Sequence, residues 1–462
     1  MTAKNDAAYA ERKLYKKEYD GFSRQKDGKK ACVLLKNCRV ENGAVTAAFA
    51  LERAKADGQG VIGQMSGTDA VCFAKPSLTR SGVRYEDVYA VGKNGVLYRY
   101  LPTTHEWSKT YEYTYTSVPR AVSYFEYTNE ECALLFGEKV VRIRNTGNVE
   151  EIASVCFKNY GCAAFERVFF AKDEKTLAYS GVQREKDYTE SADEGGYIAF
   201  SVVGGMRGIV DFKGRVYVFF EGDAYRIDAR GAARDFSCER LAYGGGEIVD
   251  GSVFNCGNAI VFATDTGIWT YDGNDFERVG FCGAERLFMQ PYAKYFAGAN
   301  GKYAFEIFDA ADARKSSVGI VYDTVSGTFV ETDADLSRVC AYGNELFVSV
   351  GGKIMRLCEK GEETGREYIV ETTSEDFSKS GLKTLRKIKL YGSGVARVSV
   401  LGKDEEGKTT GNAVASTVRL TEGGTAVCVN LTANSFIIKA YLDVNTVLRA
   451  HDAEYSAFDR GR

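Results

Sequence analysis

The chain has 462 residues, of which 45% are hydrophobic and 27% are charged, so its composition is that of a globular protein and not of a disordered tail. Its formal net charge of −3 argues against a general polyanion binder, which is usually strongly basic. No stretch approaches the roughly 18 apolar residues of a transmembrane helix. The 49 Gly, the 13% aromatic residues and the 4 Pro favour β structure, because Gly supplies turns and aromatic side chains pack well in strands.

Residues 1–30 form a charged N-terminal segment with nine basic and five acidic residues, a local excess of +4. Their mixed charges and weak apolar face predict a short charged helix or a mobile arm over residues 1–20. Such an arm is either solvated, or it docks on a neighbouring subunit or lies near nucleic acid. The segment has no apolar core of the signal-peptide type, which argues against Sec export.

Residues 31–51 (ACVLLKNCRVENGAVTAAFAL) contain two apolar runs that flank Glu41-Asn42-Gly43. Asn-Gly is a strong signal for a two-residue turn, so the segment predicts a β-hairpin. Residues 52–70 are rich in Gly and weakly patterned, and we expect a loop there.

From about residue 71 to 360 one pattern returns: an apolar run, a tight polar or Gly turn, and a second apolar run led by an aromatic residue. Clear copies are Val88–Tyr100, Ala133–Ile143, Val216–Ile227, Ile260–Tyr271 and Leu346–Leu357, and less regular ones are Val168–Tyr179 and Tyr303–Tyr322. Most copies begin roughly 43 residues after the one before, a period typical of a β-propeller. We therefore predict a propeller of about six or seven four-stranded blades over residues 31–362.

Within the repeats the apolar residues alternate. In VYVFFEGDAYRID, Val216, Val218 and Phe220 are expected on one face of the strand, and Tyr225 and Ile227 continue the pattern after the turn.

The period ends near the charged segment KGEETGR at 360–366, where we place a domain boundary. The stretches YIVETT, LRKIKLYG, VARVSVLG, TAVCVN and SFIIKAYL follow without the hairpin spacing. Residues 363–462 therefore predict a small antiparallel β-sandwich and a C-terminal tail, which makes the whole chain all-β.

Twelve Cys are spread along the chain with no CxxC pair, and most lie inside or beside apolar runs. This pattern favours buried free thiols made in a reducing cytosol, with a disulfide framework or a metal cluster as the lesser alternative. The two histidines, His105 and His451, lie far from any Cys pair. Both are expected to be exposed, His105 in a polar turn and His451 in the C-terminal tail, so no metal site and no cofactor are predicted.

The search for catalytic motifs finds no GxSxG, GxxxxGK[ST], HExxH or EF-hand sequence. The glycine clusters at 204–205 and 244–246 do not open a helix and are interpreted as turns. Two carboxylate pairs in expected loops, Asp309/Asp312 and Asp333/Asp335, could be the acids of a glycosidase or solvated turn residues. We assign no catalytic residues and expect no enzyme.

Two short segments resemble motifs of known propellers. Asp265–Trp269 (DTGIW) resembles the Asp-box turn of sialidase-type propellers but lacks the leading Ser at 263 and has its Trp one position early. Tyr322-Asp323 with Gly351-Gly352 resembles a kelch repeat, although the double glycine does not recur in each blade.

Three longer segments, in chain order, resemble phage tail-hub and nozzle proteins. The strand–turn–strand opening at Tyr19–Leu51 is similar to the start of those proteins. Glu166–Ile227, which contains AYSG, GGYI and DFKGRVYVF, resembles their middle part. Thr372–Gly407, which contains EDFSKSGLKTLRKI and VARVSVLGKDEEG, resembles their C-terminal sandwich. In short-tailed phages such proteins form a multimeric ring below the portal, through which DNA passes.

The resemblance implies a structural virion protein: a tail hub, nozzle or head-to-tail ring subunit that forms part of the DNA conduit. It implies a homo-oligomeric ring, for example a hexamer, with portal, adaptor or other tail proteins as partners and phage DNA passing without sequence specificity. The protein would be made in the bacterial cytoplasm, would reside in the virion tail and would not contact a membrane. The alternatives are a glycan- or protein-binding propeller in host adhesion and, third, a propeller glycosidase.

Overall fold

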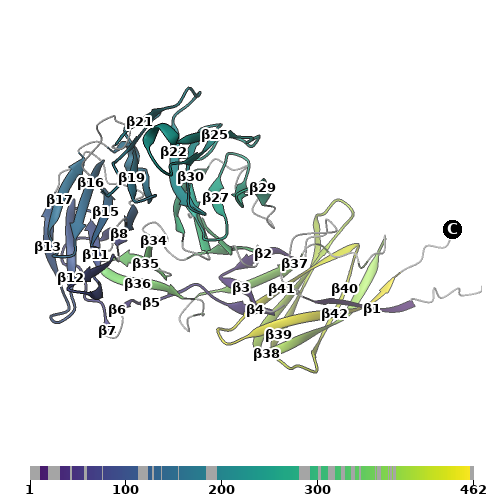
Figure 1. Cartoon of the computed structure of the whole chain (residues 1–462). Helices are drawn as coiled ribbons and strands as arrows, with labels where there is room; N and C mark the ends of the chain where they lie inside the picture. Colours follow the sequence, from purple (N-terminus) through teal and green to yellow (C-terminus); the bar gives the residue numbers. More distant parts are fainter. Residues whose placement is uncertain are drawn as a thin grey trace, which may run out of the picture.

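A computed structural model describes residues 11–18, 32–41, 44–56, 60–74, 76–112, 123–126, 130–136, 138–153, 156–183, 195–279, 292–299, 303–310, 318–323, 328–333, 339–342, 345–358, 361, 366–372, 374, 377 and 381–457. Strands and two 3-10 turns, Phe157–Asn159 and Ala233–Asp235, make up its regular structure. The predicted all-β class is confirmed: the chain forms a β-propeller with a C-terminal sandwich (Figure 1).

Within these residues, five blades are four-stranded antiparallel sheets, each formed by one continuous stretch of chain, and in the first of them a separate hairpin, β9–β10 (Ser77–Arg80, Val83–Glu86), lies between its first two strands. They are β8, β11, β12 and β13 (Ala70–Ala74, Tyr89–Gly92, Val96–Leu101, Glu106–Glu112); β14–β17 (Ser123–Glu126, Glu131–Phe136, Lys139–Arg144, Val149–Ala153); β18–β21 (Gly161–Ala164, Arg167–Ala171, Thr176–Tyr179, Gly196–Ala199); β22–β25 (Met206–Phe212, Arg215–Phe220, Ala224–Asp228, Ser237–Leu241); and β26–β29 (Phe254–Asn255, Ile260–Ala263, Ile268–Tyr271, Phe276–Val279).

The meander β30–β33 (Tyr292–Ala299, Tyr303–Ala310, Val318–Asp323, Thr328–Thr332) is the sixth blade in chain order, and it also joins the large sheet of the sandwich. The seventh contains β34–β36 (Val339–Tyr342, Glu345–Val350, Lys353–Cys358). Its fourth strand is β5 (Ala50–Arg53), where Leu51 pairs with Leu357 of β36. Each innermost strand contacts the innermost strand of the next blade, and β34 contacts β8, which closes the ring.

The seven repeated hairpins of the sequence are the two middle strands of the seven blades. Middle strands are buried on both faces by the neighbouring blades, which is why they form apolar runs. In β23, Val216, Val218 and Phe220 pack toward the third blade, while Tyr217 and Phe219 pack toward the fifth. The predicted alternation is therefore confirmed, with one face for each neighbour.

The sandwich is built around β38 (Lys383–Lys403), a 21-residue strand that continues from one sheet of the sandwich into the other. Its first half pairs with β40 (Thr425–Ala433) and β42 (Val447–Ala457), and its second half with β39 (Thr409–Leu420) and β41 (Ser435–Leu442). β37 (Tyr368–Thr372) pairs with β41. Alternate residues of β38 are buried between the two sheets, as the period of two requires.

The N-terminal boundary at residue 31 was wrong. The strands β2 (Cys32–Lys36), β3 (Cys38–Glu41) and β4 (Ala44–Ala47) belong to the sheets of the sandwich, and the propeller begins only at β5. Figure 1 shows these purple strands among the yellow-green C-terminal ones. The strands of the predicted hairpin are confirmed, because Glu41 pairs with Ala44, while Asn42 and Gly43 lie outside the described residues. The chain therefore starts in the sandwich, runs through the propeller and returns.

The helix or mobile arm expected over residues 1–20 was also wrong where the structure describes it. Glu11–Glu18 forms the strand β1, antiparallel to β42. Its sequence ERKLYKKE lacks an apolar alternation, so its strand conformation comes from pairing with β42 and not from its own pattern. The segment expected as a loop, 52–70, contains the short strands β6 (Lys55–Ala56) and β7 (Gly60–Val61).

Candidate functional site

The propeller and the sandwich are joined by a pair of strands. β2 and β33 run parallel, with Lys36 opposite Glu331, and the backbone N–H of Asn37 donates to the Glu331 carbonyl at 2.8 Å. Asn37 is fully buried with a φ of 54°, a left-handed conformation that Asn tolerates better than most residues. The sixth blade thus continues into the sandwich through main-chain hydrogen bonds.

Arg366 binds this junction together from the start of the sandwich. Its guanidinium donates to the Asp333 carboxylate at 2.7 Å, and to Oδ1 of Asn37 at 3.0 Å. It also donates to Thr332 Oγ1 and to the carbonyl of Phe49. The Asn37 amide completes the network by donating to Asp333 Oδ1 at 3.0 Å. One cation therefore links the β4–β5 connection, β33 and the β2–β3 connection, and its side chain is only 15% exposed.

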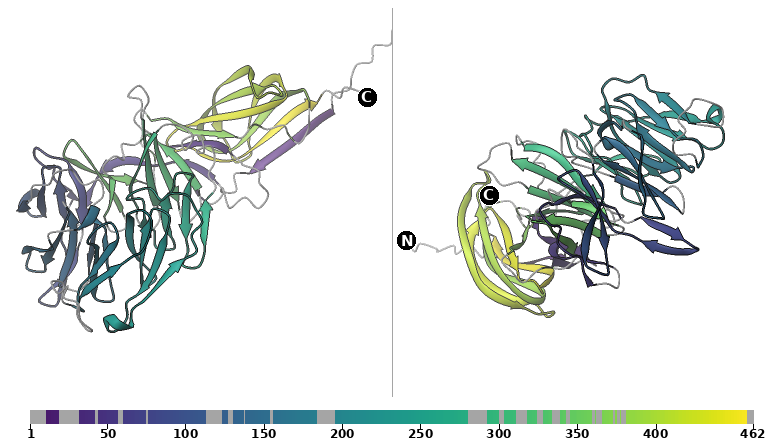
Figure 2. Two further views of the ribbon diagram at one scale, coloured as in Figure 1. Left: turned by 90° about the horizontal axis from the view of Figure 1, so that it is seen from above. Right: turned by 90° about the vertical axis from the view of Figure 1, so that its left-hand side faces the viewer.

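One apolar core also extends across the junction. Valines of β32 and β33 and residues of β35 pack in the same cluster as the strands of the sandwich: Val321, Val330, Leu346 and Val348 with Val45, Tyr368, Val370, Ile438 and Leu448. Domains joined by a small polar interface usually move relative to one another. A shared core and a shared sheet instead hold this propeller and sandwich in one arrangement (Figure 2).

Acid should weaken the junction. Burial opposes the ionisation of Asp333, but hydrogen bonds and charge from Arg366 and Lys36 outweigh it and lower the pKa of this carboxyl. A pKa that is lower in the folded chain stabilises the fold above the unfolded value of about 4, and this contribution is lost as the pH falls toward the folded value. We expect Asp333→Asn to lower the free energy of unfolding at pH 7, and this deficit to shrink between about pH 5 and pH 3. Urea denaturation across that range measures it; a deficit that stays constant to pH 3 would contradict this role.

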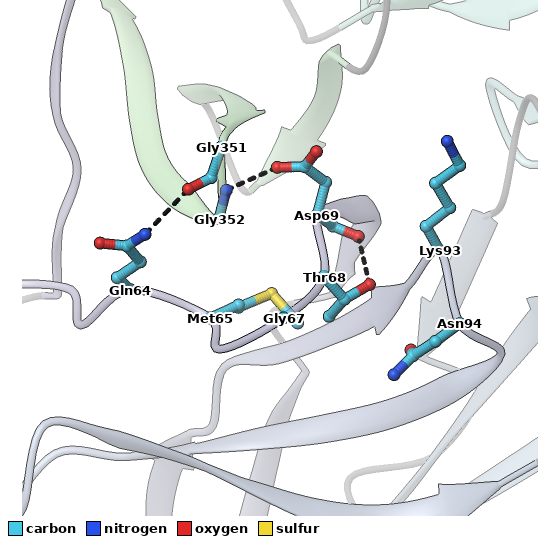
Figure 3. Close-up of a pocket in the computed structure, with 9 residues that line it drawn as sticks. All are labelled: Gln64, Met65, Gly67, Thr68, Asp69, Lys93, Asn94, Gly351 and Gly352. Atoms are coloured by element: carbon cyan, nitrogen blue, oxygen red, sulfur yellow. Dashed lines mark hydrogen bonds between the residues drawn. The ribbon is translucent and has the colours of Figure 1, made fainter.

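The second polar feature is a pocket of about 510 Å³ where the seventh blade meets the first (Figure 3). Three segments line it: the connection from β7 to β8, the β11–β12 turn and the β35–β36 turn. The lining residues are Gln64, Met65, Gly67, Thr68, Asp69, Lys93, Asn94, Gly351 and Gly352.

Hydrogen bonds fix one wall of the pocket. Asp69 Oδ1 accepts from the Gly352 N–H at 2.6 Å and from the Ser349 hydroxyl at 3.2 Å, and the Gln64 amide donates to the Gly351 carbonyl at 2.9 Å. Gly352 has a φ of 74°, and a Cβ there would lie 2.4 Å from the Met65 carbonyl oxygen. Only glycine fits this close approach.

The opposite side of the pocket carries exposed polar side chains. Lys93 and Asn94 are exposed on the β11–β12 turn, and Thr68 is half-buried. The amide of Asn94 donates to the Tyr98 hydroxyl at 2.8 Å, which orients it. A lysine, an amide and a hydroxyl around a fixed wall can hydrogen-bond a small polar ligand, and backbone groups held in place add specificity.

The structure places the residues singled out in the sequence apart from each other. His105 is exposed in the β12–β13 turn, as expected, and its Nδ1 lies 2.9 Å from the Tyr100 hydroxyl. The expectation for His451 was wrong: it is fully buried in β42, because this strand continues to Ala457 where a tail was expected. Asp333 belongs to the junction. The side chain of Asp309 and all of Asp312 and Asp335 lie outside what the structure describes.

The glycine clusters and the DTGIW segment lie in turns. Asp265–Trp269 spans the β27–β28 turn, where the Thr264 N–H donates to the Gly267 carbonyl at 2.8 Å. Gly205 precedes β22 and its carbonyl accepts from the Glu221 N–H. Gly246 accepts from the Tyr243 hydroxyl at 2.7 Å. Gly351-Gly352 forms the β35–β36 turn and a wall of the pocket. The sequence showed these turns, but not that Gly351-Gly352 lies beside Asp69 and shares a pocket with the β11–β12 turn.

The described cysteines are free thiols, and Cys38, Cys132, Cys156, Cys162 and Cys256 are buried. Burial raises the pKa of the Cys256 thiol to about 12 and that of Cys38 further, which suppresses the reactive thiolate. Cys238 and Cys428 are exposed.

Thiol labelling should separate these groups. We expect a maleimide to modify Cys428 in the native protein within minutes, and Cys238 more slowly, because partial desolvation raises the pKa of the Cys238 thiol. The five buried thiols should react only after unfolding, because thiolate and access are both required. Peptide mass mapping after timed labelling measures each site. If Cys38 or Cys256 were modified as fast as Cys428, the interior of the sandwich or of the propeller would have to open in the native state.

Over the described ranges, no three His, Cys, Asp or Glu side chains come together as metal ligands. Nor does that part of the chain contain a helix long and apolar enough to cross a membrane.

A scan against protein-family models finds no match, and a search of curated proteins finds none. Solved structures with a similar fold include a virginiamycin B lyase from Staphylococcus aureus (11% identity, 67% of this chain and 99% of that chain, TM-score 0.42). A second is PorZ, a surface component of the type-IX secretion system of Porphyromonas gingivalis (12% identity, 71% of this chain and 44% of that chain, TM-score 0.39). A third is Raptor from Chaetomium thermophilum (11% identity, 69% of this chain and 30% of that chain, TM-score 0.43). At these identities and TM-scores the likenesses carry no argument about function.

Proposed function

We propose that this chain is a structural subunit of a bacteriophage or phage-like tail: a hub, nozzle or head-to-tail ring subunit that forms part of the DNA conduit. The observation that carries the proposal is the junction, where main-chain pairing, Arg366 and one apolar core unite propeller and sandwich. A ring wall under load needs subunits that do not hinge, and this junction opposes hinging.

The three segments that resemble tail-hub and nozzle proteins lie in related parts of the fold. Tyr19–Leu51 contains β2–β4 and the start of β5, and Thr372–Gly407 contains β38. Both lie in or beside the sandwich and its junction with the propeller (Figure 1). Glu166–Ile227 contains most of the third blade and the hairpin of the fourth. The resemblance therefore includes the strands that connect the two parts, which supports a shared two-part architecture.

Solution mass tests the proposal. We expect the purified chain of 50.8 kDa to form a homo-oligomer of defined number, alone or after addition of portal and tail proteins of the same phage. Light scattering after size-exclusion chromatography measures the mass. A monomer that persists at high concentration and in the presence of those proteins would contradict a ring subunit.

The pocket between the first and seventh blades favours a second candidate, a glycan-binding propeller in host adhesion. Its exposed Lys93 and Asn94 face a wall fixed by Asp69 and Gly352, the kind of polar set that binds sugar hydroxyls. Saturable binding on a glycan array that Asn94→Ala and Lys93→Ala abolish would support this function. Lys109→Ala, at an exposed lysine of β13, is the matched control and should bind as the wild type does.

A further inference from the structure

Two N-terminal strands cover one edge of β42 in tandem. β38 pairs with the other edge along the length of β42. On the covered edge, Val45 of β4 pairs with Leu448. β1 pairs with the following residues of β42, from Glu18 opposite Ala450 to Glu11 opposite Ala457. Both strands are antiparallel to β42, so they run in the same direction, one after the other. Figure 2 shows the purple β1 beside the yellow β42, at the end of the sandwich away from the propeller.

The two strands differ in how they are attached. β4 is half of a hairpin with β3, and its Val45 is fully buried in the core shared with the propeller. β1 pairs with β42 alone among the described strands. Thirteen residues, 19–31, separate β1 from β2, and such a segment can span up to about 45 Å. The connection is therefore long enough for β1 to pair with the β42 of its own chain or of an adjacent chain.

The covered edge has a chemistry that fits β1. Asp452 of β42 is only 5% exposed. One of its carboxylate oxygens accepts from the Tyr391 hydroxyl, and the other, Oδ1, is buried without a hydrogen-bond partner. In the register, Lys16 lies opposite Asp452, and β1 as a whole has four basic and two acidic residues. Opposite charges at directly paired positions stabilise a sheet, and like charges destabilise it.

We infer that β1 is exchanged between neighbouring subunits, so that Glu11–Glu18 of one copy pairs with β42 of the next. This inference rests on the proposed ring, whose contacts it specifies. Exchange of an identical strand preserves every contact of β1 and costs little, and it links subunits through eight residue pairs. Repeated around a ring, it joins each sandwich to the next by a continuous sheet.

Photocrosslinking in a mixed assembly tests the exchange. A photoreactive phenylalanine replaces Tyr15, which lies opposite Ala453, and heavy- and light-isotope copies are unfolded together, refolded and assembled. We expect crosslinked peptides that join a heavy β1 to a light β42 in the oligomer fraction. The same probe at Thr432, which lies opposite Thr384 of its own chain, should give same-chain products only. Crosslinks from Tyr15 that stay within one chain in the oligomer would overturn the exchange and leave the ring intact.

A charge pair provides a second test. Lys16→Glu places an acid opposite Asp452, whereas Lys13→Glu makes the same charge change opposite Tyr455. We expect Lys16→Glu to raise the concentration for half-assembly about tenfold, and Lys13→Glu to change it far less. Equal assembly of the two variants, or an intact ring after deletion of residues 1–18, would overturn the exchange. A wild-type chain that stays monomeric under all conditions would overturn the ring, and the exchange with it.

Discussion

Replacing Arg366 with alanine should lower the free energy of unfolding by about 3 kcal/mol. The side chain is 15% exposed and hydrogen-bonds Asp333, Asn37, Thr332 and the carbonyl of Phe49. Its loss leaves these acceptors without their shared donor, and groups in a partly buried site recover only part of that hydrogen bonding from water. Urea denaturation at pH 7 measures the change.

The matched control is Arg449→Ala, in the sandwich. The Arg449 side chain is 52% exposed, and it pairs at 3.3 Å with Glu422, which is 65% exposed. Because exposed ion pairs contribute little, we expect a change below about 0.5 kcal/mol. If Arg366→Ala were as mild as Arg449→Ala, the network at the junction would not hold the propeller and the sandwich together.

Replacing Arg167 with alanine should lower the free energy of unfolding by about 3–5 kcal/mol. Arg167 is 1% exposed, in β19. Its guanidinium donates to the Ser180 carbonyl at 2.7 Å and to the Gly231 carbonyl at 3.2 Å, and it lies over the rings of Tyr179 and Phe236. The substitution removes the hydrogen bond to Ser180 within the third blade and the hydrogen bond to Gly231 of the fourth, and it leaves a cavity where the side chain packed.

Arg234→Ala is the control for Arg167, because it removes a guanidinium from the adjacent 3-10 turn. Its side chain is 76% exposed and lies 4.0 Å from Asp235, so we expect a change below about 0.5 kcal/mol. The comparison uses denaturation followed by far-ultraviolet circular dichroism. Equal stability of the two variants would mean that the blades do not depend on the buried cation.

Local pattern was sufficient to predict the repeats. Strands such as Arg215–Phe220 lie between two blades, so nearly every residue is apolar, and a short turn such as Asn94-Gly95 separates each from its partner. These signals lie within about a dozen residues, and they located the middle hairpins of all seven blades. The sandwich strands after residue 366 were visible for the same reason.

Long-range pairing could not be predicted in this way. β5 closes the seventh blade by pairing with β36, some 300 residues later, and Lys36 pairs with Glu331. No feature of the sequence near either strand indicates which distant strand it pairs with. β1 has no apolar pattern to mark it as a strand, and His451 was taken for a tail residue because polar residues such as His451, Asp452 and Glu454 interrupt the apolar residues of its strand. The pocket was missed because the connection and the two turns that line it meet only when the ring closes.

Electron cryomicroscopy of the assembled protein tests the central claim most directly. We predict closed rings in which every subunit shows the same angle between propeller and sandwich, with density continuous from the sixth blade into the sandwich. Single chains in which the sandwich takes many orientations relative to the propeller, with no ring at any concentration or with any tail protein present, would contradict it.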